Sequence, residues 1–464
     1  MAGTPGKSST RIASIDVLRG LTILGMTMCA YIGWNSNLPA WMFHAQTPPP
    51  TYEFRPDVPG LTWVDLVFPF FLFSMGAAFP FAMKKKLDRG TGKHVLALGL
   101  FKRWLILTAF SLVLGNSITV RWSGIPAVWQ ELFLIGVWGA MFMSLTRFPT
   151  KRAWKRNIFN IIGLGLLTLL AGIKHDFING NFSLTNCDII MSILAAVSLF
   201  GGIIWLLTAG SMKLRILVFL FIAAIKAVAS FTPIFDSITF TGWPLFDISY
   251  LQYLLIALPG SMVGDILLKS SKETEPENTP GRMAGTAAAI ICIAALVFQL
   301  WGIQTRHVLL TLCVTSGLLA VFCLIIRRDT CTWTRIATIG FAFMIAGIAL
   351  DFADGGMTKD YCNLSYLFET CGMAALTAAV FHFFDKEYGC RFPLMSGCGQ
   401  NPMIAYTAAS YIIVPILSLT GLMGLLTGAA AGSQFWGVAQ GVIITLLLAL
   451  FTNIFTKAKL FWRS

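Results

Sequence analysis

Long apolar segments separated by short polar ones constrain this chain more than any other feature. A helix needs about 20 apolar residues to cross the ~30 Å hydrocarbon core of a bilayer, and fourteen segments meet or approach that length. Because a bilayer offers no hydrogen bonds to the backbone, such segments form helices. We therefore predict an all-α, polytopic integral membrane bundle of about 12–14 transmembrane helices, with segments at 13–33, 62–83, 95–117, 127–146, 158–173, 188–208, 213–232, 249–268, 283–302, 308–326, 335–351, 364–384, 398–419 and 436–456.

Composition excludes a soluble globular protein. Hydrophobic residues make up 56% of the 464 residues and charged residues only 12%, against roughly 25% charged in soluble domains. The segments follow one another closely, so we predict a single transmembrane domain over 1–464, in which 269–282 (KSSKETEPENTPGR) is a flexible linker. The segments 158–173 and 335–351 are short for a span.

The positions of the basic residues predict the orientation. If both termini are cytoplasmic, 27 of the 34 Lys and Arg residues fall at cytoplasmic loops and helix ends, and five fall on the opposite side, namely Arg55, Arg121, Lys174, Arg306 and Lys359. This asymmetry follows the positive-inside rule. The net charge of +13 is thus explained by topology, and nucleic acid is not an expected partner.

Polar groups inside the predicted spans are candidates for function, since ionisable residues in hydrocarbon face protein or water. Asp16 and Arg19 stand three residues apart on one helix face, and we predict a structural ion pair. Lys226 lies deep in its segment, where pairing with an acid or snorkelling is the simpler explanation. Others lie at or near span ends: Asp65, Gln130, Glu131, Asp247, Asp265, Gln400 and Asn401.

The non-cytoplasmic stretch from 34 to 60 is the better candidate for chemistry of the two long polar excursions. It is rich in Pro and aromatic residues and carries His44, which precedes the span that contains Asp65. A solvated histidine is the simpler interpretation of this position taken alone. The ten cysteines show no CxxC or Cys/His metal spacing, so we predict neither a metal site nor a redox role.

Several motifs resemble the transmembrane acyltransferases typified by heparan-α-glucosaminide N-acetyltransferase. The resemblance rests first on SIDVLRGLTILGM, FHA and PGLTWVDLVFPFFLFSMGAAF. Further pieces agree in order: GIPAVWQELFLIGVWGAMF, DISYLQYLLIALPGSMVGD, NLSYLFETCGM, GCGQNPMIAY and KLFWRS. The regions 188–232 and 283–330 fall outside the resemblance and are interpreted as two inserted helical hairpins.

The resemblance implies an activity and assigns roles. Members carry an acetyl group from cytosolic acetyl-CoA to the amine of a terminal glucosamine across the membrane, and His44 matches their active-site histidine. An imidazole suits both roles open to it, a base for the attacking amine or a carrier of the acetyl group. Asp65 either orients His44 or makes a packing hydrogen bond with Asp16, Arg19 or Asn401.

Binding residues are assigned on the same basis. Substrate-binding candidates are Asn35, Asn37, Trp41, Gln130, Glu131 and Asn401. Candidates for the CoA phosphates are Lys84, Lys85, Lys86, Lys102, Arg103, Arg152, Lys155 and Arg156, most of which are explained equally well by the positive-inside rule.

Two positions and one insertion depart from the family pattern. Ala30 stands near the place of an asparagine, Glu131 replaces an arginine, and QTPPPTYEFRPDVP is inserted after the FHA motif.

The resemblance thus implies an acetyl-CoA-dependent N-acetyltransferase of the bacterial inner membrane that acts on an amino sugar or glucosaminide at the periplasmic side. The expected partners are membrane lipids, acetyl-CoA and this acceptor, and a homodimer is an assembly open to the chain. One alternative is a transporter of amino sugars or glycan precursors, which needs the same polar interior. A second is a structural or regulatory component that kept the scaffold alone.

Overall fold

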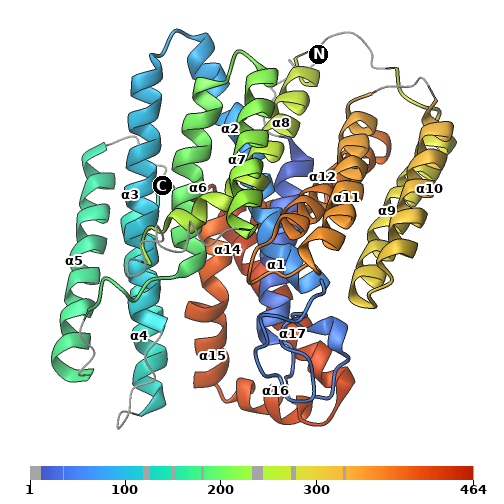
Figure 1. Cartoon of the computed structure of the whole chain (residues 1–464). Coiled ribbons are helices and arrows are strands. Elements are labelled where there is room, and N and C mark those ends of the chain that lie inside the picture. Colours follow the sequence, from blue (N-terminus) through green and yellow to red (C-terminus); the bar gives the residue numbers. More distant parts are fainter. Residues whose placement is uncertain are drawn as a thin grey trace, which may run out of the picture.

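The computed structural model describes residues 12–34, 36–118, 126–148, 153–178, 182–231, 244–272, 278–327 and 331–462. Over these residues the chain is helical with no strand, and the long helices run roughly side by side (Figure 1). The elements are α1 (Ala13–Tyr31), η1 (Ala40–Met42), α2 (Trp63–Asp88), α3 (Lys93–Ile118), α4 (Ala127–Leu145), α5 (Ala153–Ile178), α6 (Ile189–Leu207), α7 (Met212–Phe231), η3 (Ile248–Tyr253), α8 (Leu254–Ser270), α9 (Arg282–Gln304), α10 (Val308–Ile326), α11 (Thr332–Asp354), α12 (Leu364–Tyr388), α13 (Pro393–Gln400), α14 (Pro402–Ala408), η4 (Ala409–Ile413), α15 (Val414–Leu419), α16 (Leu422–Ala430) and α17 (Gln434–Lys457).

The helices confirm the predicted fold class. Twelve helices in the described part of the chain are long and apolar enough to cross a membrane, and α5 holds a further apolar stretch at Asn157–Gly172. With α7 these match the fourteen predicted segments. The chain is an all-α integral membrane protein. We call the end of the bundle that bears most Lys and Arg the basic face, and the other end the far face.

Three segments differ from their predicted bounds. The spans predicted as short, 158–173 and 335–351, belong to helices of 26 and 23 residues. The predicted span 398–419 is interrupted at Asn401, which leaves helical geometry just before Pro402, because proline disfavours the helical conformation in the residue before it. The structure also adds the short helix α16, which has no counterpart among the predicted segments.

Glycines allow the innermost helices to pack backbone against backbone. A Cβ at Gly76 of α2 would overlap the carbonyl oxygen of Ala257 in α8, and one at Gly260 would overlap that of Phe73. Small residues give helices close approach in membranes, where the hydrophobic effect does not drive them together. The pair α2–α8 therefore forms a rigid wall in the middle of the bundle.

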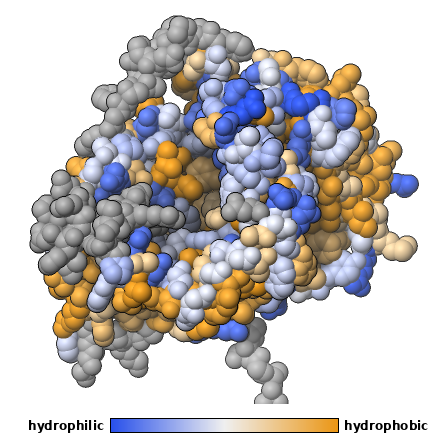
Figure 2. Space-filling view, turned by 90° about the horizontal axis from the view of Figure 1, so that it is seen from below, coloured by the Kyte–Doolittle hydropathy of each residue, from blue (hydrophilic) through white to orange (hydrophobic). Residues whose placement is uncertain are grey.

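The outer helices have fewer buried residues. Only 33% of the apolar window of α9 and 22% of that of α10 is buried, against 78% for α12. These two helices lie at one side of the bundle in Figure 1, and α5 lies at the other. In Figure 2, which looks at the far face, hydrophobic residues cover much of the flank and the surface is hollowed between the helices.

One helical turn beside this interior is wider than an α-helical turn. The segment η4 is a π-helix between α14 and α15. Its Ser410 hydroxyl lies 2.9 Å from the hydroxyl of Tyr31, and the hydroxyl of Tyr411 lies 2.6 Å from that of Ser117. π-Helical turns are rare and occur frequently at functional sites.

Candidate active site

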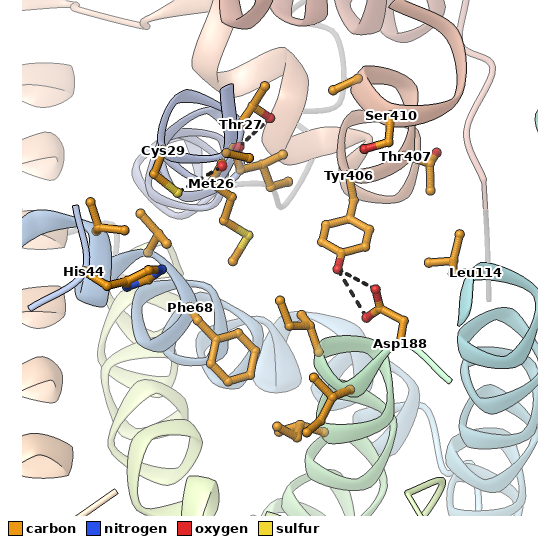
Figure 3. Close-up of a pocket in the computed structure, with 18 of the residues that line it drawn as sticks. Met26, Thr27, Cys29, His44, Phe68, Leu114, Asp188, Tyr406, Thr407 and Ser410 are labelled. Atoms are coloured by element: carbon orange, nitrogen blue, oxygen red, sulfur yellow. Dashed lines mark hydrogen bonds between the residues drawn. The ribbon is translucent and has the colours of Figure 1, made fainter. Parts of the chain in front are cut away.

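A cavity of about 560 Å³ opens between α1, α2, α6 and the α14–η4 segment near the far face. Its wall is mostly apolar, and its charged lining residues are His44, Asp65, Asp188, Lys359 and Asp360. Figure 3 shows His44 on one side of this far-face cavity and the Asp188–Tyr406 pair on the other. A concave apolar site with a few convergent polar groups is the usual form of a small-molecule site.

His44 and Asp65 form the shortest charged contact in this cavity. The His44 Nδ1 lies 2.6 Å from the Asp65 Oδ1, and the Asp65 side chain is fully buried while 31% of the His44 side chain is exposed. A carboxylate carries no proton, so Nδ1 is the donor in this contact. The lone pair of the imidazole is therefore on Nε2. Among the described residues, the Asp65 carboxylate is bonded to His44, Ala45 and Thr62, and not to Asp16, Arg19 or Asn401, the partners of the packing alternative.

The backbone around α2 holds Asp65 in place. Its Oδ2 accepts hydrogen bonds from the amides of Thr62, at 3.0 Å, and Ala45, at 3.3 Å. The first of these is a capping interaction at the start of α2, where helix amides lack partners. The Tyr366 hydroxyl donates to the Asp65 carbonyl from α12 at 3.2 Å. Both carboxylate oxygens thus have fixed partners.

An aromatic cluster supports His44 from the loop side. The rings of Trp34, Phe43 and Tyr52 have centroids 4.8–5.5 Å apart, and Phe43 is 1% exposed. The Thr62 hydroxyl lies 2.8 Å from the Phe43 carbonyl. This packing explains how a loop rich in proline presents one histidine in a defined position.

Lys359 adds a cation that the sequence analysis did not place in the site. Its Nζ lies 3.2 Å from the His44 Nδ1 and 3.9 Å from the Asp65 Oδ1. Since Nδ1 already donates to Asp65, we assign Lys359 to balancing the Asp65 charge. Its signal in the sequence is weak but present, because Lys359 is one of few basic residues on the side that the positive-inside rule depletes.

The loop that carries Lys359, residues 355–363, is fixed by an ion pair from α9–α10. Arg306 donates to both carboxylate oxygens of Asp351, at 3.0 and 2.9 Å, and Asp351 accepts the Met357 amide at 2.5 Å. Gly356 has a φ of +128°, and a Cβ there would clash with Pro59. Arg306 thus supports the loop that carries Lys359, and it comes from a hairpin that the sequence analysis interpreted as an insertion.

Asp188 is a second carboxylate that the sequence analysis missed. It caps α6 by accepting the Met191 amide at 2.8 Å, and it accepts from the Tyr406 hydroxyl at 3.0 Å. Burial raises the pKa of the Asp188 carboxyl above its ordinary value. The signal was its position directly before an apolar run, which is typical of an N-cap.

A second cavity of about 320 Å³ follows along the same helices toward the basic face. Arg19 and Arg103 line it, with Phe71 and Ala82 of α2 and Trp462 near the chain end. The last α2 residue in the far-face cavity is Phe68 and the first in this basic-face cavity is Phe71, a separation of about 4.5 Å along a helix. The two cavities are therefore in line across the bundle.

The arginines of the basic-face cavity differ in their partners. Arg19 lies 3.7 Å from Asp16 and donates to the carbonyls of Gly399 and Ser74. The buried Nε of Arg103 has no hydrogen-bond partner among the described residues. This cavity therefore offers positive charge with unused donor capacity, which suits an anionic ligand.

The other residues that the sequence analysis proposed for binding substrate or CoA do not line these two cavities or are not described. Asn37 and the half-exposed Trp41 are on the far face but are not among the residues that line the far-face cavity, and neither are Gln130 and Glu131 of α4. Asn401 is buried toward the basic face, where it donates to the Leu460 carbonyl at 2.8 Å. Lys84, Lys85, Lys86 and Lys102 do not line the basic-face cavity. Asn35, Arg152 and the side chains of Lys155 and Arg156 lie outside the described residues.

Comparison with known protein families gives one match. A family model described as a domain of unknown function, DUF5009, matches residues 11–267, which is more than half of the chain. The chain belongs to the DUF5009 family. The part matched by the DUF5009 model contains His44, Asp65, Arg103 and Asp188, whereas Lys359 lies beyond it. No curated protein matches the chain.

Proposed function

We propose that this protein is a membrane-bound acyltransferase of the bacterial inner membrane. It would move an acetyl group from acetyl-CoA at the basic face, taken as cytoplasmic, to the amine of an amino sugar or glucosaminide at the far face. The observation that carries the proposal is the His44–Asp65 pair in a cavity directly in line with a second, arginine-lined cavity. This arrangement suits a reaction whose donor and acceptor enter from opposite sides.

Acetyl transfer needs a group that handles one proton. In one route the acceptor amine attacks the thioester carbonyl, His44 Nε2 takes the amine proton, and the CoA thiolate leaves and is protonated. In the other route Nε2 attacks first, CoA leaves, and the amine then displaces the acetyl group from the imidazole. Both routes use the same Nε2 lone pair, and in both Asp65 fixes the tautomer and stabilises the positive charge that develops on the ring.

The remaining charged groups have roles in binding. Arg103 and Arg19 would hold the CoA phosphates, because guanidinium groups bind phosphate with paired hydrogen bonds. Asp188 faces His44 across the cavity and would accept hydrogen bonds from the hydroxyls or the amine of the sugar. Lys359, whose Nζ lies 3.9 Å from the Asp65 Oδ1, would balance the negative charge of that carboxylate.

The test is acetyl transfer from radiolabelled acetyl-CoA to glucosamine and glucosaminides by the purified protein in liposomes. Wild type and His307→Ala, which removes an exposed histidine of the N-cap of α10, should form product, and His44→Ala should not. If no acceptor is labelled while the liposomes take up amino sugar, the transporter alternative replaces the proposal. If neither occurs, the chemistry is absent and the scaffold serves a structural role.

A further inference from the structure

A lateral groove of about 970 Å³ lies on the other side of the loop 355–363 from the far-face cavity. It runs between α6, α7 and the η3–α8 junction, and loop residues such as Thr358 and Tyr361 form one of its edges. Most of the wall toward the bundle is apolar and comes from Phe200, Ile204, Ile222, Ile225, Leu251 and Leu254. A groove of this volume and lining suits a hydrocarbon chain.

One cation lies within this apolar wall. Lys226 is five residues from the end of α7, about 7.5 Å along the helix axis. Its Nζ donates to the Gln252 side-chain oxygen at 2.8 Å, and the structure gives it no ion pair with any described residue. Because a cation in a transmembrane segment is costly without a counter-charge, this position favours the binding of an anion.

The mouth of the groove carries the opposite charge. Asp57, in the far-face loop, and Asp354, the last residue of α11, both line it. Asp57 is exposed, and Asp354 also accepts the Ser365 amide at 2.8 Å. The side chain of Asn363 is already engaged with the backbone of Thr358 and Gly356. From the far face inward, the groove thus presents carboxylates, then an ammonium group, then an apolar channel.

We propose that this groove binds a membrane phospholipid whose head group carries a primary ammonium, of the phosphatidylethanolamine type. The acyl chain would lie along the apolar wall, the phosphate would pair with Lys226, and the head-group ammonium would lie between Asp57 and Asp354. A purely anionic head group would meet the two carboxylates at the mouth without compensation. The proposal concerns binding and does not depend on acetyl transfer.

The experiment is lipid binding by the purified full-length protein in detergent, followed by native mass spectrometry. The probes are phosphatidylethanolamine, phosphatidylglycerol with matched acyl chains, and inorganic phosphate. Wild type should bind phosphatidylethanolamine several-fold more tightly than phosphatidylglycerol, and inorganic phosphate should neither bind nor compete. Lys226→Met should bind phosphatidylethanolamine at least tenfold more weakly, as expected for the loss of one charge-assisted hydrogen bond. Lys213→Met, at the other end of α7, is the matched control and should bind as wild type does.

A second pair of variants keeps the test decisive if Lys226→Met does not fold. Lys226→Arg keeps the charge and should retain phosphatidylethanolamine, and Asp57→Asn changes an exposed loop residue and should reduce the preference for phosphatidylethanolamine over phosphatidylglycerol. Equal binding of the two phospholipids to wild type overturns the proposal. So does a folded Lys226→Met that binds like wild type, or competition by inorganic phosphate, which would indicate a free anion as the ligand.

Discussion

The far-face and basic-face cavities lie along the same helices but hold their charges differently. In the far-face cavity, Asp65 and Asp188 each accept several hydrogen bonds, and His44 and Lys359 lie within 4 Å of Asp65. In the basic-face cavity, Arg103 keeps a buried Nε without a described partner. The first arrangement fixes atoms before a substrate arrives, and the second leaves donor capacity for a ligand. Fixed groups favour a role in the reaction step, and free donors favour a role in binding.

The largest effect is expected from the fixed pair. His44→Ala should lower the rate of acetyl transfer by about 10²–10⁴-fold, the usual contribution of a general base, and Asp65→Asn should cause a loss of similar order because it no longer fixes the ring tautomer. Steady-state kinetics in liposomes measure this, with thermal melting as the check on folding. A His44→Ala protein with wild-type kcat would remove the far-face cavity from the chemistry.

Arg103 should affect donor binding instead of the reaction step. Arg103→Met should raise the KM for acetyl-CoA by about 10–100-fold, since hydrogen bonds to charged groups contribute about 1.5–3 kcal/mol, and leave kcat within a few-fold. The neighbouring exposed Lys102→Met is the matched control and should change neither parameter. If Lys102→Met and Arg103→Met have equal effects, general attraction between the basic face and CoA explains binding.

Asp188 should affect acceptor binding in a pH-dependent way. Asp188→Asn should raise the acceptor KM about tenfold at pH values above the raised Asp188 pKa, where the carboxylate is charged, and this difference should disappear as the pH falls below that pKa. The charged carboxylate favours acceptor binding but lowers the stability of the folded protein. Because the pKa is raised in the folded protein, wild type should lose stability relative to Asp188→Asn as the pH rises from the ordinary aspartate range through that pKa. Thermal melts of both proteins across this range check the sign.

The smallest effect is expected from Arg306, which lies outside both cavities. Arg306→Gln removes the paired hydrogen bonds to Asp351 and loosens the loop that carries Lys359, so kcat should fall about three- to tenfold with the KM for acetyl-CoA unchanged. Arg306→Lys should restore part of the loss, because it keeps the charge but not the paired geometry. A parallel rise in the KM for acetyl-CoA would show that the variant disturbs the whole bundle.

The helices could be predicted from the sequence because each apolar run must be helical in lipid. The predicted bounds were wrong at helix ends and interruptions, which this rule does not determine. Polar residues such as His175 and Asp176 end the apolar run of α5 before the helix itself ends. The interruption at Asn401 depends on one residue before a proline. Helix existence is thus determined by composition, and helix ends by local chemistry.

The site was predictable only in part. A shared motif brought His44 and Asp65 together, and the structure shows them in contact. Lys359, Asp188 and Arg306 come from loops and caps far apart in sequence, and only the packing of α6, α9 and α11 brings them near the cavity. The sequence analysis assigned Arg19 to an ion pair with Asp16. The structure shows that pair and also places Arg19 in the wall of the basic-face cavity.

The shape of the far-face cavity depends on the number of residues in the π-helical segment η4, and not only on their types. A π-turn accommodates one residue more than an α-helical turn of the same rise. Deleting a single residue from 409–413 would allow an uninterrupted α-helix, in which the flanking helices α14 and α15 keep nearly their present orientation while the side chains of the turn itself change direction. If the deleted residue is Ile412 or Ile413, Tyr411 would turn away from Ser117, although every residue that lines the cavity would still be present. Homologous chains that align through this segment without a gap are therefore expected to keep the shape of the cavity, whereas those one residue shorter are expected to have a different one.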